Sequence, residues 1–407
     1  MQVSSKISSI SLKQSSLKKP GQDSAIAPPP HAPSLFIFIE IFAREGGIQS
    51  YVKDIFRSLL DTEQPTQADV FLLRDQPNCE NLYATPNLRF RYFKRRSPQL
   101  DRLWMAIALL LYLLQVRPPR VFCGHINLAP LVWCFCRPLR IPYTVMTHGK
   151  EVWEPLPWLS RKALQQADQI WTVSRYSRDR AARSNQLNPD KIRLMPCAVD
   201  GDRFTPGEKS AELIRRYNLE GSTVLMTVAR LWSGDIYKGV DVTIRALPTI
   251  AQAIPTVKYL VIGRGDDQPR LAQLAEDMGV GDRVVFAGFV PTEDLPDHYR
   301  LADGYVMPSQ EGFGIVYLEA MACGVPVISG DADGSADPLQ NGALGWQVPH
   351  RDAIAVAQAC IELLQAQQAD PASELRVQGA WLRAQTLEKF SKVAFAQRLQ
   401  ESITSAK

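Results

Sequence analysis

The chain has 407 residues, which is enough for two or three domains of ordinary size. Apolar residues make up 45% of the chain and charged residues 22%, a globular composition that excludes a wholly disordered, collagen-like or disulfide-scaffold protein. Lys and Arg exceed Asp and Glu by only 46 to 42, a net charge of +4. This small excess does not favour nucleic acid, so we expect no nucleic-acid partner and only local basic functions.

The N-terminal segment and the cysteines indicate a cytoplasmic protein. Residues 1–33 are rich in Ser, Lys, Gln and Pro and lack the apolar core of a secretory signal, so we expect a disordered tail. The seven cysteines form no C-x-x-C pair, which is typical of free thiols in a reducing compartment. The longest apolar run, residues 103–116, is shorter than the roughly 20 residues of a membrane-spanning helix. It predicts a buried or interfacial helix.

In chain order, the first half alternates strand and helix patterns. Strands are expected at 35–42, 70–73, 121–123, 143–146 and 170–173, and helices at 48–60, 103–116, 130–137 and 176–184. This alternation predicts a parallel sheet covered by helices on both faces.

A second alternating series follows a Pro- and Gly-marked stretch at 196–208. Strands are expected at 224–228, 259–262, 284–286, 305–307 and 325–328, helices at 240–253, 268–279, 295–301 and 315–322, and helix again after 346–348. We therefore predict two α/β domains, 34–205 and 206–385, facing each other across a cleft, and a C-terminal helix, 386–407, that packs back on the first domain.

Two glutamates spaced E-x7-E follow the expected strand 305–307. Glu311 lies in a glycine-rich loop and Glu319 lies about one turn into the next helix, so both can point at one extended ligand. The backbone N–H groups near Gly314, Ile315 and Val316 form an anion site at the helix N-terminus. Taken alone, the two glutamates would favour the alternative of two solvated acids on an ordinary strand-to-helix turn.

The whole stretch EGFGIVYLEAMACGVPVI resembles the hallmark of glycosyltransferase family 4, the group 1 glycosyltransferases. The resemblance covers most of the chain after residue 34 and is strongest over 223–349. It implies the GT-B fold, with two facing Rossmann-like domains. It also implies transfer of a sugar, with retention of anomeric configuration, from a nucleotide diphosphate sugar to an acceptor hydroxyl. Polysaccharide, glycolipid and cell-envelope glycan synthesis are the expected settings.

The same resemblance assigns the donor site. Arg230 and Lys238 would hold the diphosphate, whose developing charge fixed cations stabilise; a surface Arg and a helix-start Lys are the alternatives. Glu311 would contact the donor sugar and Glu319 the ribose. The remaining donor-side positions are Gly46, Gly47, Gly263, Val290, Phe313, Gly314, Ile315 and Val316.

Two histidines follow expected strands of the first domain. The resemblance places His148 near the reacting centre, where it could stabilise charge; a structural His at a strand end is the alternative. His125, with Asn127, is a candidate on the acceptor side or a structural residue. We expect His148, Glu311, Arg230 and Lys238 to carry the catalysis.

Two D-x-D patterns, at 200–202 and 331–333, could bind a divalent metal. Both lie in glycine-containing turns, and ordinary loop chemistry explains them better. We therefore predict a site without metal and without a cofactor.

A basic, aromatic segment precedes the apolar run 103–116. It predicts either a solvated charged surface or contact with an anionic membrane at its inner face, which would suit a lipid-linked acceptor. Its basic residues are Arg89, Arg91, Lys94, Arg95, Arg96 and Arg102.

Two other functions fit a GT-B fold. One is a catalytically silent subunit that only binds nucleotide. The other is a GT-B phosphorylase or epimerase, and a phosphorylase needs a pyridoxal-phosphate lysine.

Overall fold

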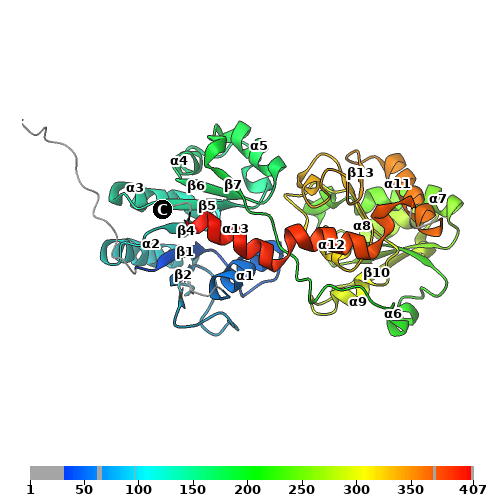
Figure 1. The fold of residues 1–407 in the computed structure, drawn as a ribbon, viewed down its shortest axis with the longest axis horizontal. Helices are drawn as coiled ribbons and strands as arrows, with labels where there is room; N and C mark the ends of the chain where they lie inside the picture. The colour runs from blue at the N-terminus through cyan, green and yellow to red at the C-terminus, as the bar shows by residue number, and fades with distance from the viewer. Residues whose placement is uncertain (1–31, 62–66, 96, 370–372, 405–407) are drawn as a thin grey trace, which may run out of the picture.

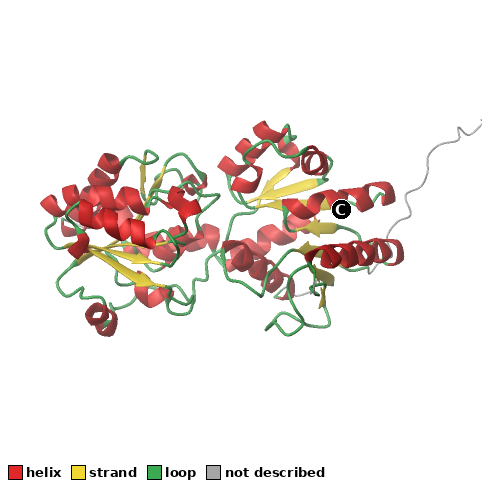
Figure 2. Ribbon diagram, turned by 180° about the vertical axis from the view of Figure 1, so that it is seen from behind, coloured by secondary structure: helices red, strands yellow, loops and turns green. Residues whose placement is uncertain are grey.

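The computed structural model describes residues 32–61, 67–95, 97–369 and 373–404. Nearly all of the expected tail, residues 1–31, lies outside this range. The described residues form two α/β units that lie along the long axis of the molecule (Figures 1 and 2).

The first unit holds, within the described residues, a parallel sheet of seven strands in the order β3-β2-β1-β4-β5-β6-β7. Helices cover both faces, which explains why its central strands are apolar runs rather than alternating patterns. The strands are β1 (Ser34–Phe38), β2 (Ala68–Leu72), β3 (Leu88–Tyr92), β4 (Val121–Cys123), β5 (Tyr143–Thr147), β6 (Gln169–Thr172) and β7 (Ile192–Leu194). The helices are α1 (Gly47–Leu60), α2 (Pro98–Gln115), α3 (Ala129–Leu139), α4 (Trp158–Gln165) and α5 (Arg175–Asn185).

The second unit holds, again among the described residues, six parallel strands in the order β10-β9-β8-β11-β12-β13. The strands are β8 (Thr223–Val228), β9 (Val257–Ile262), β10 (Val284–Gly288), β11 (Gly304–Met307), β12 (Val327–Gly330) and β13 (Trp346–Val348). Its helices are α6 (Ala211–Arg216), α7 (Val240–Ala253), α8 (Gln268–Asp277), α9 (Leu295–Tyr299), α10 (Ile315–Ala322) and α11 (Ala353–Gln368).

Both sheets have the Rossmann strand order, in which the direction of winding reverses beside the first strand. The reversal lies between β1 and β4 in the first sheet and between β8 and β11 in the second. Ligands of such sheets bind outside the carboxyl ends of the strands at this point. The loops after these four strands are therefore where a site is expected.

The last two helices lie on different units. Helix α12 (Gly379–Phe390) packs against α10, and α13 (Lys392–Thr404) packs against α1 of the first unit (Figure 1). The rings of Tyr51 and Phe395 meet edge to face, 5.6 Å apart, in this second contact. The Val199 N–H donates to the Phe390 carbonyl at 2.8 Å, so the two segments that cross between the units lie side by side.

The first part of the basic segment forms the edge strand β3, and both of its arginines, Arg89 and Arg91, are exposed. Arg89 forms two hydrogen bonds with Asp69 of β2, at 2.7 and 2.9 Å, and the Arg91 guanidinium lies 5.6 Å from the Tyr112 ring centroid. The alternation of Leu88, Phe90 and Tyr92 with these arginines is a strand pattern hidden by the charges. Strand β7 and helix α4 of this unit were also missed.

Candidate active site

The loop between β11 and α10 is fixed by its backbone. The Glu311 N–H donates to Asp333 Oδ2 at 2.6 Å, and the Glu311 carbonyl accepts from the Gly334 N–H at 2.8 Å. Gly314, with φ of 88°, lies just before α10, and a left-handed conformation there favours glycine. The first N–H groups of α10, at Ile315 and Val316, lack partners inside their own helix and can face an anion.

Lys238 meets Glu311 at this loop. The Lys238 ammonium donates to Glu311 Oε1, and both side chains are largely shielded, at 21% and 16% exposed. Gly239 follows Lys238 with φ of 77°, and a Cβ there would lie 2.6 Å from the Pro308 carbonyl oxygen. Only a glycine therefore lets the Lys238 turn pack this closely against the end of β11.

Arg230 follows β8 and lies at the exposed edge of the same region. Its Nε donates to the buried Asp235 at 2.5 Å, and its guanidinium lies 5.3 Å from the Trp232 ring. The Asp235 carboxylate raises the pKa of Arg230. The Arg230 side chain remains 66% exposed, so its outer nitrogens are available to a ligand.

A cation from the first unit reaches this group. The Lys150 ammonium lies 3.0 Å from the centroid of the Tyr237 ring, and the Lys238 ammonium lies 5.4 Å from the same ring. Partial burial lowers the pKa of Lys150, and the Glu311 carboxylate opposes that shift. Sequence reasoning missed Lys150, although it stands two residues after His148 at the end of a predicted strand.

His148 lies at the end of β5, facing the same side. Its Nε2 is 3.1 Å from the Gly124 carbonyl, its N–H donates to the Glu151 carboxylate, and its ring meets Tyr51 edge to face at 5.5 Å. The Gly124 contact favours a proton on Nε2 and leaves Nδ1 as the ring atom that could accept a proton.

His125 has a structural partner. Its Nδ1 accepts from the Asn127 N–H at 3.1 Å and caps the short helix Ile126–Leu128. Burial lowers the pKa of His125. The Asn127 side chain is exposed at the same loop. These two residues lie after β4, next to the loop of His148.

Glu319 and Phe313 are more buried than a ligand-facing role suggests. The Tyr299 hydroxyl donates to Glu319 Oε2 at 2.7 Å, and burial raises the pKa of Glu319 to about 7. The Phe313 ring is 3% exposed and meets Phe390 edge to face at 5.7 Å. Phe313 can therefore face a donor only through its backbone.

The remaining predicted donor positions line the same edge. Gly46 and Gly47 form the exposed start of α1. Gly263 has φ of 138°, and a Cβ there would lie 1.8 Å from the Ala229 carbonyl oxygen, so this glycine serves close packing of the β8 and β9 ends. Val290 follows β10, beside Phe289, whose ring lies 4.6 Å from the Arg264 guanidinium.

The two units touch at glycines. A Cβ on Gly312 would lie 2.3 Å from the His148 carbonyl oxygen, and one on Gly149 would lie 2.8 Å from the Gly312 Cα. The Gly312 carbonyl accepts from the Ser174 hydroxyl at 2.6 Å. The loop of Glu311 therefore lies directly against the loop of His148.

One aspartate of each D-x-D pattern holds its loop in place. Asp333 accepts from the Glu311 and Ser335 N–H groups, at 2.6 and 2.8 Å, and burial raises its pKa to about 7. Asp200 pairs with Lys392 and accepts from the Asp202 N–H at 3.2 Å. Asp333 and Asp200 thus make contacts of the kind that loop chemistry predicts.

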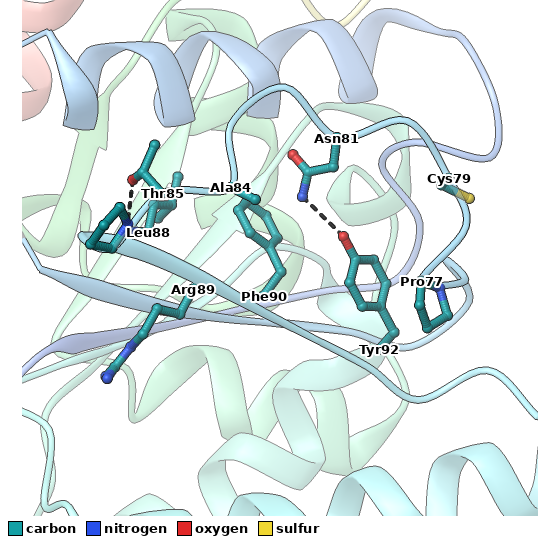
Figure 3. Close-up of a pocket in the computed structure, with 10 residues that line it drawn as sticks. Pro77, Cys79, Asn81, Ala84, Thr85, Leu88, Arg89, Phe90 and Tyr92 are labelled. Atoms are coloured by element: carbon teal, nitrogen blue, oxygen red, sulfur yellow. Dashed lines mark hydrogen bonds between the residues drawn. The ribbon is translucent and has the colours of Figure 1, made fainter.

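A separate pocket of about 560 Å³ lies in the first unit, away from these residues (Figure 3). It is open to solvent between the loop after β2 and the edge strand β3, and Asn81 donates to the Tyr92 hydroxyl within it at 3.0 Å. None of the predicted site residues lines it. The candidate active site is therefore the region where the loops at the carboxyl ends of the two sheets meet. Its four charged side chains are Lys150, Arg230, Lys238 and Glu311.

Comparison with known proteins gives matches to both halves. The family profile described as Glycosyltransferase Family 4 matches residues 45–203, and the profile described as Glycosyl transferases group 1 matches residues 222–366. A Mycolicibacterium smegmatis GDP-mannose-dependent alpha-(1-6)-phosphatidylinositol monomannoside mannosyltransferase is 38% identical over 240 residues, 55% of this chain and 60% of that relative. The chain thus spans less than two thirds of that relative's length.

A longer match is to the Corynebacterium glutamicum GDP-mannose-dependent monoacylated alpha-(1-6)-phosphatidylinositol monomannoside mannosyltransferase, 30% identical over 79% of this chain and 86% of the relative. Among solved structures, sucrose-phosphate synthase from Thermosynechococcus elongatus aligns with a TM-score of 0.73 at 24% identity, covering 92% of this chain and all of that one. Anabaena HepE in complex with UDP and glucose aligns with a TM-score of 0.71 at 19% identity, with the same coverage. These likenesses confirm the predicted GT-B fold.

Proposed function

Because the chain belongs to glycosyltransferase family 4, the group 1 glycosyltransferases, we propose that it transfers a sugar from a nucleotide diphosphate sugar to an acceptor hydroxyl. One observation carries this proposal. Lys150, Arg230, Lys238 and the first N–H groups of α10 gather around Glu311, between the carboxyl ends of both sheets. Lys238 is paired with Glu311 and Arg230 with Asp235, so the cations are already held in place, and a strongly anionic ligand such as a diphosphate can compete for them.

The residues divide the work as follows. Lys238 and Arg230 bind the diphosphate and stabilise the charge that grows on it as the sugar leaves. Donor binding separates Lys238 from Glu311, whose carboxylate then accepts hydrogen bonds from the sugar hydroxyls. His148 lies across the contact between the units, where it stabilises charge at the reacting carbon. Attack on the same face from which the diphosphate leaves would retain configuration, and the leaving phosphate would take the acceptor proton.

For the substrates, we propose GDP-mannose as donor and an inositol glycolipid as acceptor. The activities named for the mycobacterial and corynebacterial relatives support this choice. HepE, which was solved with UDP and glucose, supports UDP-glucose as the competing donor. The reaction would serve glycolipid or cell-envelope synthesis and would need neither metal nor cofactor.

Release of GDP from GDP-mannose by the purified protein tests the proposal, with phosphatidylinositol monomannoside as acceptor and UDP-glucose as alternative donor. Lys238→Ala should lower turnover by roughly 10²- to 10³-fold, the loss expected for one preorganised charge stabiliser. Lys389→Ala, an exposed lysine on α12, is the matched control and should keep full turnover.

Three outcomes would contradict parts of the proposal. Nucleotide binding without release from any donor would indicate a silent subunit. A visible absorbance band from pyridoxal phosphate would indicate a phosphorylase. Loss of activity in excess EDTA, restored by Mn²⁺ or Mg²⁺, would return the D-x-D segments to the site.

A further inference from the structure

Helix α2 carries a row of apolar side chains on its outer side. Residues 103, 104, 107, 110, 111 and 114 follow helical spacing, and at 100° per residue they fall within an arc of about 120°. They are Leu103, Trp104, Ile107, Leu110, Leu111 and Leu114, and each is 37–55% exposed. We call these six residues the outer stripe of α2.

The outer stripe is not required for the fold. The opposite side of α2 supplies the core contacts, through buried side chains that include Met105, Leu109 and Leu113. The helix is therefore apolar on two sides, although only one side has a neighbour among the described residues. A second apolar side of this size on a surface helix indicates a partner.

The charges beside the outer stripe are positive. Lys94, Arg95 and Arg102 are exposed at the N-terminal end of α2, whereas Asp101 is buried. The buried Asp101 carboxylate accepts a hydrogen bond from the Arg95 N–H at 2.8 Å, which fixes the segment between β3 and α2 against the helix. The Arg95 guanidinium lies 4.9 Å from the centroid of the Trp104 ring. The cations are thus held next to the apolar row.

We propose that the outer stripe of α2 docks on the surface of an anionic lipid bilayer. Apolar side chains of a helix lying in the bilayer interface enter the acyl boundary, Trp prefers the headgroup level, and nearby Lys and Arg pair with anionic lipids. No helix within the described ranges has the length and apolar character to cross a membrane, so this contact is lateral. An apolar row alone would also fit a second copy of the chain, and the adjoining cations favour the bilayer.

This docking would place the first unit, at the end remote from the second unit, against the membrane (Figure 1). It would suit a lipid-linked acceptor, but it does not depend on the transfer reaction. Vesicle binding needs neither donor nor acceptor, so failure of one proposal is distinguishable from failure of the other.

Co-flotation of the full chain with vesicles tests the docking. The wild type should bind vesicles of phosphatidylcholine and phosphatidylglycerol in equal parts, and bind phosphatidylcholine alone weakly. The triple variant Leu103→Asn, Ile107→Asn, Leu111→Asn should lose binding. Ile354→Asn, which changes an exposed apolar residue on α11 of the second unit, should retain it.

The cations are tested separately. Arg95→Gln with Arg102→Gln should weaken partitioning by roughly 25-fold, since each cation near an anionic surface contributes about fivefold. Arg215→Gln with Arg245→Gln, which removes two exposed cations from the second unit, should change it little.

Equal binding to both vesicle types, or no binding to either, would overturn the proposal. So would a dimer in solution that the triple variant converts to monomer while vesicle binding is absent, which would assign the stripe to a second copy. Circular dichroism of each variant shows that loss of binding is not loss of fold.

Discussion

Lys150 is the residue whose place in the site depends most on contact between the two units. It belongs to the first unit, yet its ammonium lies on the ring of Tyr237, from the second unit, and senses Glu311. Because this ammonium comes from one unit and its neighbours come from the other, it can contact a diphosphate bound to the second unit only when the two units are in contact. We therefore propose that Lys150 couples donor binding to the arrangement in which the two units are in contact.

Replacing Lys150 should lower kcat for sugar transfer. We expect Lys150→Ala to lose about 10- to 100-fold, less than Lys238→Ala, because the Lys150 side chain is more exposed to solvent. Lys150→Arg should recover part of the loss by restoring the charge. Steady-state kinetics with GDP-mannose measure this, with Lys162→Ala on α4 as control. Wild-type kinetics for Lys150→Ala would remove it from the site.

Glu319 carries a burial cost that depends on pH. Burial raises its pKa from 4.5 to about 7 in the folded protein. The folded state therefore holds a proton that the unfolded state releases between these values, so the contribution of Glu319 to stability falls as pH rises from about 4.5 to 7. Above that window the ionised carboxylate is buried at full cost.

Glu319→Gln should remove this pH dependence. The stability of the variant relative to wild type should increase by up to about 3 kcal/mol between pH 4.5 and pH 8, since one pKa unit corresponds to about 1.4 kcal/mol. Urea unfolding without nucleotide, at several pH values, measures the difference. A difference that stays constant with pH would show that Glu319 keeps an ordinary pKa.

At the scale of elements, the loops after β5 and β11 pack backbone against backbone. Gly149 and Gly312 leave no room for a side chain between them, and Ser174 at the start of α5 holds the Gly312 carbonyl. This contact sets the distance from His148 to Glu311, which lie on different sheets. Close approach of the two loops is therefore a requirement of the site rather than of either core.

Gly312→Ala should separate the two loops. Its methyl group would lie 2.3 Å from the His148 carbonyl oxygen, and the units must shift to relieve the overlap. We expect turnover to fall by about 100-fold, the usual effect of a misplacement of about 1 Å, while both cores remain folded. Thermal unfolding and turnover measured on the same sample check this. Full turnover would show that the contact is dispensable.

At the scale of the whole molecule, the units are joined by a pair of crossing segments and, on the cleft side, by polar contacts that include those of Arg175. The Arg175 N–H and Nε donate to the Asp337 carboxylate at 2.7 and 2.6 Å, and its Nη2 donates to Asn341 at 2.8 Å. Arg175 begins α5 and Asp337 follows the helical turn Gly334–Ala336, so the contact lies beside the loop of Glu311.

Arg175→Ala should favour a more open arrangement of the units. The Arg175 side chain is partly exposed, so the contact contributes about 1 kcal/mol or less and its loss shifts the ratio of closed to open molecules by up to about fivefold. Small-angle scattering should show a larger radius of gyration, which saturating GDP reduces. Arg178→Ala, which removes an arginine paired with Asp179 within α5, is the control and should leave the radius unchanged.

The sequence by itself determined the repeated strand–helix alternation, most element boundaries and the two loops, those of His148 and Glu311, that meet at the candidate site. Local patterns carry this information, because buried parallel strands are apolar runs and helix starts are marked by glycine loops such as Gly312–Gly314. The sequence analysis missed strand β3, because the contacts that its arginines make come from other elements. Arg89 pairs with Asp69 and Arg91 lies over an aromatic ring.

Only the tertiary structure decided which charges meet. Lys150 joins Lys238 around Tyr237, Phe313 turns into the core, and Glu319 is buried against Tyr299. The tertiary structure also decided which apolar side of α2 packs into the core and which side is exposed. Burial, pKa and contacts between units arise from residues far apart in the chain, so no local pattern can specify them.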